Sequence, residues 1–243
     1  MKKTVKTLVI LILIAAICVS GYNIYKISDQ YTQEARVKRS LQKYRPNVKS
    51  PDNFGEKTDG SGEVINLRVI ELQNEVNSDI IGWLTIPGTR IDYPFVIAGD
   101  NSYYLQRDVY GDYSAAGTLF MDYRCARDFS GFNNIIYGHN MKSNSMFGDL
   151  ALFADRDFFE AHPSGTILLC DRTYTLDFFA YIIVDADDSL IYSISEPEDA
   201  LLEYISAMAH NYREPVTNEK IVVLSTCSYA YDGARIILIG SCM

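Results

Sequence analysis

A single cysteine, Cys227, follows an apolar run at 221–226 that ends in two hydroxyl residues. The chain then turns and enters a second apolar run at 234–240, which carries Arg235 near its start. A thiolate next to a fixed cation is a reactive nucleophile, and the cation can stabilise the oxyanion that forms when the thiolate attacks a carbonyl carbon. The cysteine and the arginine therefore indicate acyl-transfer chemistry.

A histidine offers the proton transfer that this chemistry needs. His139 follows the apolar run 133–137 and precedes a polar loop, and an imidazole in such a strand-end position exchanges protons near neutral pH. The other two histidines are interpreted as structural. His162 lies in a turn before a proline, and His210 lies at the end of a predicted helix, where a positive charge complements the helix dipole.

Several motifs resemble the sortase transpeptidases. The string Leu224-Ser225-Thr226-Cys227, with Arg235 eight residues after the cysteine and Tyr137-Gly138-His139 upstream, is similar to their signature. Val223 stands where that signature usually has its first threonine. The class B branch of the family fits best, and the similarity runs from about residue 67 to the last residue. The stretches that carry it are 91–94, 100–105, 117–124 and 137–150.

The resemblance implies a membrane-anchored cysteine transpeptidase of a Gram-positive bacterium that uses no cofactor and no metal. Such an enzyme cleaves the C-terminal sorting motif of a secreted protein after its threonine. Cys227 would form a thioester, His139 would protonate the departing amine and deprotonate the incoming one, and Arg235 would stabilise the oxyanion. The acyl group would pass to an amine of a lipid II-type peptidoglycan precursor. A pilin lysine is the alternative acceptor, for a sortase that polymerises pili.

The resemblance also implies where the substrate peptide binds. The expected contacts fall on the segment after the second barrel strand, on the loop before the last helix and on the end of the cysteine strand. The residues are Asn101, Leu105, Leu190, Ile191, Tyr192, Ser225 and Thr226. Ser228 stands where many class B members have an acid, so no role is carried over to that position.

A cluster of acids, Asp185, Asp187 and Asp188, raises the question of a calcium site. The cluster lacks the loop glycine and the spaced bidentate glutamate of a calcium-binding loop, so a solvated turn is expected instead. The five cysteines show no zinc-ligand spacing and no Cys-x-x-Cys pair. For an unpaired cysteine outside the cell, reactivity is the favoured explanation.

Strands dominate the rest of the chain, which predicts a mostly β, α+β fold with an eight-stranded, sortase-type β-barrel. The expected strands are 82–86, 91–96, 117–122, 133–137, 166–170, 173–184, 221–225 and 234–240. The expected helices are an N-terminal amphipathic helix with apolar positions from Leu67 to Ile81, which residues 77–79 would interrupt, and shorter ones at 145–154, 157–161 and 197–211.

The N-terminus predicts a membrane anchor. Residues 7–25 carry no charge and follow three lysines. Their length is close to the roughly 20 residues that span a bilayer, and the lysines place Met1 in the cytoplasm and the catalytic domain outside, in a single pass. A cleaved signal peptide is the alternative, but the segment lacks a clear Ala-x-Ala site, and Ile17 before Cys18 makes a poor lipobox. The expected domains are an anchor at 1–25, a stalk and linker at 26–63 and a catalytic domain at 64–243.

Charge divides unevenly between these parts. Residues 1–45 carry a net charge of +7, and residues 46–243 carry −16. An acidic exterior domain argues against nucleic acid as the partner. The stalk carries a basic stretch, and two interpretations of it stay open: contact with anionic lipid headgroups, or a solvated helix face. Its residues are Arg36, Lys38, Arg39, Lys43 and Arg45.

Two other classes of protein are alternatives to a transpeptidase. A cysteine peptidase or hydrolase of the papain or cell-wall amidase kind places its cysteine at a helix N-terminus and upstream of the histidine. Here His139 precedes Cys227 by 88 residues. A non-catalytic adhesin or scaffold built on the same barrel would leave Cys227 unreactive.

Overall fold

The computed structural model describes residues 2–46, 56–58, 64–217 and 219–243. The chain separates into two compact units, Met1–Gln42 and Lys43–Met243. Within the expected stalk and linker at 26–63, residues 47–55 and 59–63 lie outside the described residues.

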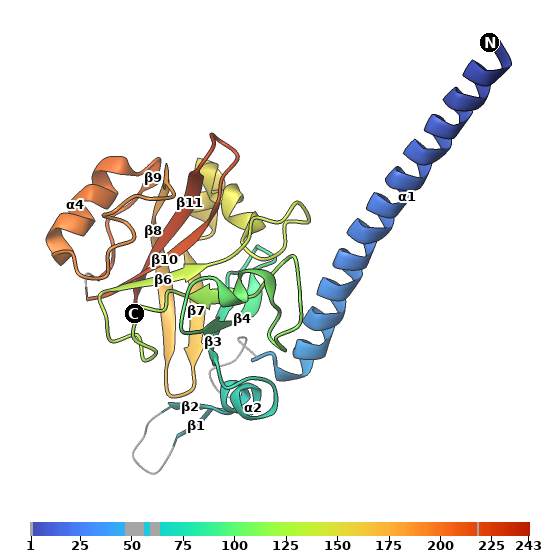
Figure 1. Ribbon diagram of the computed structural model, residues 1–243. Coiled ribbons are helices and arrows are strands. Elements are labelled where there is room, and N and C mark those ends of the chain that lie inside the picture. The colour runs from blue at the N-terminus through green and yellow to red at the C-terminus, as the bar shows by residue number, and fades with distance from the viewer. Residues whose placement is uncertain (1, 47–55, 59–63, 218) are drawn as a thin grey trace. The chain divides into compact units, whose positions relative to one another are not determined.

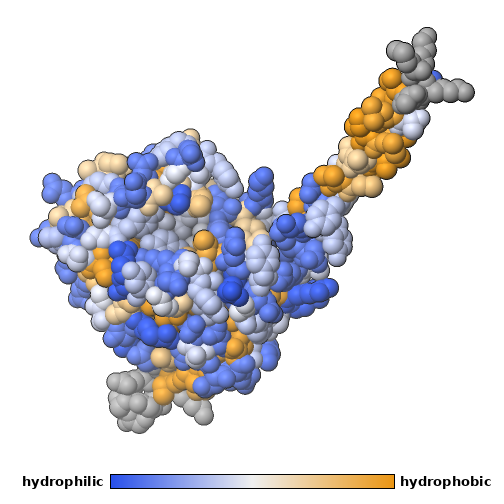
Figure 2. All heavy atoms as spheres, in the orientation of Figure 1, coloured by the Kyte–Doolittle hydropathy of each residue, from blue (hydrophilic) through white to orange (hydrophobic). Residues whose placement is uncertain are grey.

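The first unit is a single long helix, α1 (Lys2–Leu41). Among the described residues it is the one helix that is long and apolar enough to cross a membrane, and Figure 2 shows apolar side chains over its N-terminal part. The polar, helix-permissive segment after residue 31 continues this helix to Leu41. By length and composition, α1 is consistent with an anchor followed by a helical stalk.

The second unit is built around a closed β-barrel (Figure 1). The strands run in the order β11-β10-β6-β5-β4-β3-β7-β8, and the pairing of β8 with β11 closes the barrel. All eight expected strands are present, so the predicted barrel is confirmed. Their bounds are β3 (Ile80–Thr85), β4 (Asp92–Ile97), β5 (Leu119–Met121), β6 (Asn133–Tyr137), β7 (Ser164–Leu169), β8 (Thr173–Asp185), β10 (Ile221–Cys227) and β11 (Ala234–Cys242).

Three short strands were not predicted. They are β1 (Glu56–Thr58), which pairs with β2 (Val64–Asn66), and β9 (Asn211–Tyr212), which pairs with β8. Asn211 had been assigned to the last helix, but its side chain donates to the carbonyl oxygens of Phe153 and Ala154, at 2.8 and 3.1 Å, and holds the chain in this bridge instead.

Helices and 3-10 turns connect the strands. The described ones are η1 (Gln42–Tyr44), α2 (Leu67–Glu75), η2 (Tyr103–Gln106), η3 (Gly148–Ala154), α3 (Arg156–Ala161) and α4 (Glu198–Met208). Pro197 occupies the N-cap position of α4, and two acids in the first turn lie near the positive end of the helix dipole. The interior of the barrel is apolar and is filled by residues such as Phe178, Ile182 and Ile237, each with no exposed surface.

The N-terminal amphipathic helix, α2, ends at Glu75, just before the interruption expected at 77–79, and Ile80 and Ile81 belong to β3. The side-chain oxygen of Asn77 accepts the backbone N–H of Asp79 at 2.9 Å and so competes with helical hydrogen bonding. The helix expected at 145–154 is shorter than predicted. It starts only at Gly148, as a 3-10 helix, because Asn144 and Met146 have φ values of 57° and 51°.

The glycine in β3 is a sharp test of this packing. A Cβ on Gly82 would lie 2.7 Å from the carbonyl oxygen of Leu168 on the paired strand and 2.6 Å from the ring of Phe95. We expect Gly82→Ala to lower the free energy of unfolding by about 1–3 kcal/mol, the usual cost of overpacking a core. Urea denaturation measures it. Gly131→Ala is the matched control, since nothing lies within 4 Å of its Cβ position, and equal stability of the two variants would contradict the packing described.

Candidate active site

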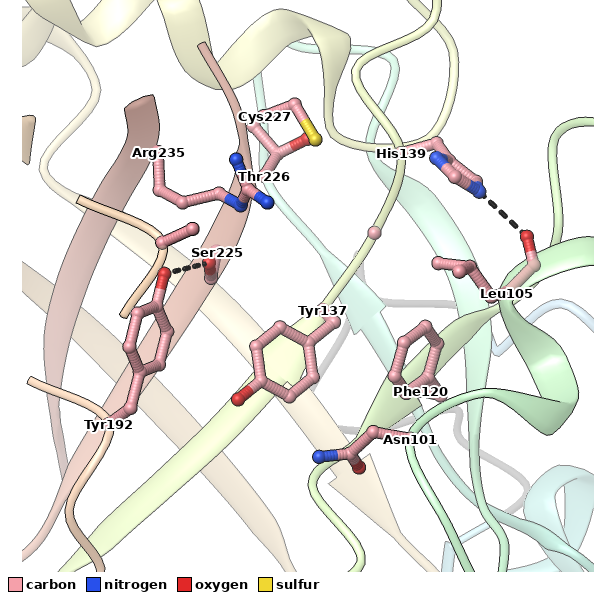
Figure 3. A pocket seen from close by; sticks show the side chains of 12 residues that line it. Asn101, Leu105, Phe120, Tyr137, His139, Tyr192, Ser225, Thr226, Cys227 and Arg235 are labelled. Carbon is pink, nitrogen blue, oxygen red and sulfur yellow. Dashed lines mark hydrogen bonds between the residues drawn. The ribbon is translucent and has the colours of Figure 1, made fainter. Parts of the chain in front are cut away.

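Three neighbouring strands bring Cys227, His139 and Arg235 to one edge of the barrel. The strand β10 is antiparallel to β11, with Cys227 directly opposite Arg235. The same strand is parallel to β6, with Ser225 opposite Tyr137. Cys227 and His139 each lie two residues beyond that pair. Figure 3 shows Cys227 and Arg235 on one side of a hollow and His139 across from them.

A glycine lets the histidine follow β6 so closely. Gly138 donates its N–H to the carbonyl oxygen of Ser225 at 3.1 Å, which continues the pairing beyond the strand. A Cβ on Gly138 would lie 2.4 Å from Leu119 and 2.7 Å from the ring of Phe147, so no larger residue fits without displacing its neighbours. The residue before His139 is therefore fixed by close packing.

Hydrogen bonds hold the histidine and the backbone of the cysteine. The Nε2 atom of His139 lies 2.6 Å from the carbonyl oxygen of Leu105. Because a carbonyl oxygen only accepts, Nε2 is the protonated donor in this arrangement. The side-chain amide of Asn140 donates to the carbonyl oxygen of Cys227 at 2.8 Å, which ties the two strand ends together.

The arginine is fixed by its own turn. Its Nη1 atom donates to the carbonyl oxygens of Gly233 and Ala234, at 3.2 and 3.0 Å. Within the described residues Arg235 forms no ion pair with an acid, Asp232 of the preceding turn included. The guanidinium instead lies beside Thr226 and Cys227 (Figure 3).

The three side chains face one cavity of about 350 Å³. Five of the seven expected substrate contacts also line it, and they come from three separate segments. The lining residues are Asn101, Leu105, Phe120, Tyr137, Gly138, His139, Ala186, Tyr192, Ser225, Thr226, Cys227 and Arg235.

The structure does not bring Leu190 and Ile191 to the cavity. Ile191 is fully buried in the core, and Leu190 is half-buried outside the lining. The carboxylate of Asp188 accepts the N–H groups of both residues, at 3.0 and 2.9 Å, and this turn directs Ile191 inward. Tyr192 follows the turn and does line the cavity, where its hydroxyl lies 2.9 Å from that of Ser225.

Four lining residues were missed from the sequence. They are Phe120, Tyr137, Gly138 and Ala186. Strand alternation was a usable signal for one of them, because Tyr137 lies two residues before His139 and side chains two apart point to the same face. Phe120 needed the fold, since its ring lies beside Tyr137 on the paired strand β6, with 5.3 Å between centroids.

The acidic cluster at 185–188 has structural partners. Asp188 receives a hydrogen bond from the hydroxyl of Tyr204 in addition to the two N–H groups. No group of three or more potential metal ligands occurs in the described part of the chain. Asp188 therefore anchors the loop before α4.

The cysteines differ in exposure. Cys227 is exposed, whereas Cys125 and Cys242 are buried, and all the described cysteines are free thiols. Burial raises the pKa of the Cys125 and Cys170 thiols, and it raises the pKa of Cys242 to about 12. Since the thiolate is the nucleophilic form, these three thiols are poorly reactive near neutral pH.

Comparison with known proteins gives the family. No protein-family model matches the sequence. Sortase B of Listeria monocytogenes is 35% identical over 190 residues, which cover 75% of this chain and 76% of that protein. A class B sortase of Streptococcus pyogenes involved in pilus biogenesis is 36% identical with a TM-score of 0.67, over 72% of this chain and 97% of that one. A Staphylococcus aureus sortase B–substrate complex is 27% identical with a TM-score of 0.67, over 74% and 86%.

An eight-stranded barrel with a cysteine, a histidine and an arginine around one cavity is the arrangement of a cysteine transpeptidase. At this identity and coverage, the chain belongs to the class B sortases.

Differences in thiol exposure predict which cysteine of the barrel reacts first. We expect iodoacetamide at about pH 8, near the ordinary pKa of a thiol, to alkylate Cys227 before Cys125, Cys170 and Cys242. Peptide mapping by mass spectrometry follows each site over time, and Cys227→Ser identifies the fast phase. Earlier labelling of Cys125 or Cys242 would contradict the burial described.

Proposed function

We propose that this protein cleaves the C-terminal sorting motif of secreted proteins after its threonine and transfers the acyl group to an amine of the peptidoglycan precursor. The supporting observation is the strand register that gathers Cys227, His139 and Arg235 around one cavity. The S. aureus relative was solved with its substrate, which supports a peptide as the ligand of such a cavity.

The first half of the reaction is acylation. The Sγ atom of Cys227 attacks the threonine carbonyl carbon, and the resulting tetrahedral oxyanion collapses to a thioester as the C–N bond breaks. His139 protonates the departing amine. Because Nε2 of His139 is engaged by Leu105, its Nδ1 atom is the one left to exchange a proton in this arrangement.

Arg235 stabilises the oxyanion in this scheme. Its Nη1 atom is occupied by two backbone carbonyl groups, which fix the guanidinium, and Nε and Nη2 are the donors left for the substrate. A lysine carries the charge but lacks the rigid fork of donors.

The second half is transfer. His139, now neutral, takes a proton from the incoming amine, whose nitrogen attacks the thioester carbonyl and releases the thiolate of Cys227. Asn101, Leu105, Tyr192, Ser225 and Thr226 form the substrate-binding walls. Leu190 and Ile191 are left out of this role because neither lines the cavity.

The location follows from the N-terminal helix. We place residues 1–25 as a single-pass anchor with a cytoplasmic tip, 26–63 as stalk and linker, and 64–243 as the catalytic domain outside the cell. The support is the apolar N-terminal part of α1 and the three preceding lysines.

A pilin lysine is the second candidate acceptor. It is favoured by the relative from S. pyogenes, which is 36% identical and is involved in pilus biogenesis. The two acceptors share the same acylation half and differ only in the amine that resolves the thioester. Product analysis with a peptidoglycan-precursor amine and a lysine-bearing pilin, offered together, distinguishes them.

The nucleophile is tested with the full chain in detergent and a library of sorting-motif peptides. We expect cleavage after threonine and, with an amine acceptor, a ligated product. Cys227→Ala should abolish both, and Cys170→Ser is the matched control that should keep them. Cleavage by the Cys227→Ala protein would overturn the proposal, as would a papain-type activity that cuts peptides lacking the motif.

The arginine is tested by a conservative exchange. We expect Arg235→Lys to lower kcat by about 10²-fold, within the range for losing an oxyanion donor. Arg127→Lys, an exposed arginine outside the cavity that donates to the carbonyl oxygen of Ser78, should leave kcat unchanged. Full activity of Arg235→Lys in the same peptide assay would remove Arg235 from the oxyanion site.

A further inference from the structure

A fully buried carboxylate lies next to the cavity without lining it. Asp122 follows β5 and has no exposed surface. Its two oxygens accept five hydrogen bonds, two of them from the side chains of Asn101 and Tyr137, at 3.0 and 2.9 Å. The other three come from Arg124, through its backbone N–H, Nε and Nη2, at 3.0, 2.8 and 2.8 Å.

The residues that donate to Asp122 support three walls of the cavity. Two of them form walls themselves, and the third holds another wall residue in place. Asn101 and Tyr137 line it directly. Arg124 also donates to the carbonyl oxygen of Tyr192 at 3.0 Å, and Tyr192 lines the cavity from the loop before α4. Figure 3 shows Asn101, Tyr137 and Tyr192 together at the end of the hollow away from Cys227. One carboxylate therefore connects three segments that are distant in sequence.

The charge of this group is maintained by its partners. Burial alone would raise the pKa of Asp122, but the hydrogen bonds from Arg124, Tyr137 and Asn101 outweigh it, and the pKa is lowered. Burial and the charge of Asp122 raise the pKa of Tyr137, so its hydroxyl stays protonated and donates. Asp122 is thus an ionised acceptor at neutral pH, and Asn101, Tyr137 and Arg124 all donate to it.

These contacts exclude a part in the chemistry. Asp122 is absent from the cavity lining and is fully buried, so it cannot exchange a proton with a bound substrate. What it can do is fix the positions of the side chains that meet the peptide. Charge-assisted, bidentate hydrogen bonds such as those from Arg124 are suited to this, because they are short and directional.

We propose that Asp122 is a positioning residue that preorganises the peptide-binding end of the cavity through Asn101, Tyr137 and the Arg124–Tyr192 link. The inference rests on the proposed function, since it assigns these walls to the sorting peptide. Loss of this preorganisation weakens peptide binding and leaves the reacting groups at Cys227 in place. The expected signature is a rise in KM with kcat retained.

Asp122→Asn removes the charge and keeps the shape. In the peptide-cleavage assay with the full chain, we expect KM to rise by about tenfold or more and kcat to stay within about twofold. The rate at which iodoacetamide alkylates Cys227 should stay the same. A general distortion of the site would change this rate. Tyr137→Phe and Arg124→Lys each remove only part of the network and should raise KM by less, so they serve if Asp122→Asn does not fold.

Asp92→Asn is the matched control. Asp92 is also paired with an arginine, Arg45, at 2.5 Å, and accepts the indole N–H of Trp83 at 2.8 Å, but none of these three residues lines the cavity. The control should lower stability without changing KM. Binding of the peptide to the Cys227→Ala protein measures its affinity in the absence of turnover. Adding Asp122→Asn to that protein should lower this affinity in parallel with the rise in KM.

Two failures are distinguishable. If the wild-type chain cleaves sorting peptides and the Asp122, Tyr137 and Arg124 variants keep the wild-type KM, or lose kcat at constant KM, the positioning role is overturned and the proposed function stands. If the wild-type chain neither binds nor cleaves any sorting peptide, the proposed function falls and the inference falls with it.

Discussion

The register of β10 between β6 and β11 is the constraint on which the site depends. Side chains alternate along a strand, so a slip of one residue would move Cys227 to the opposite face of the sheet. Parallel pairing with β6 aligns the cysteine with His139, and antiparallel pairing with β11 aligns it with Arg235. Barrel closure through β8 and β11 leaves β11 no free edge along which to shift. A thiol, an imidazole and a guanidinium are therefore positioned by backbone hydrogen bonds.

The two ends of the cavity are held in place by different kinds of contact. Around Cys227 the groups are held by backbone and amide contacts, from the carbonyl oxygen of Leu105 to the side chain of Asn140. At the far end, the buried charge of Asp122 orients the walls. A buried carboxylate is stable only when its hydrogen bonds are satisfied, which makes this end of the cavity rigid. The reacting end keeps an exposed thiol, as nucleophilic attack requires.

Much of the fold was predictable because the barrel strands are long apolar runs between turn residues. The convergence of Cys227, His139 and Arg235 on one cavity was also predictable, since each lies at the end or start of such a run. The break at 77–79 was predictable from its polar residues, but other helix bounds failed where local contacts overrode the pattern. Positive φ values at Asn144 and Met146 delay one helix, and the side chain of Asn211 bonds to Phe153 and Ala154 beyond the end of another. Ile191 was misplaced because the turn capped by Asp188 decides which way the loop faces. Asp122 escaped notice because its partners are distant in sequence, and only the folded chain brings them together.

In the proposed reaction, Cys227 carries the acyl group between the two substrates. The decisive measurement is the intact mass of the full chain mixed rapidly with a sorting-motif peptide in the absence of an amine acceptor. We expect a mass increase equal to the acyl fragment of the peptide up to its threonine, located on the Cys227 fragment and released by hydroxylamine, as a thioester is. If the protein cleaves the peptide without ever carrying this adduct, or carries it on another residue, Cys227 is not the acyl carrier.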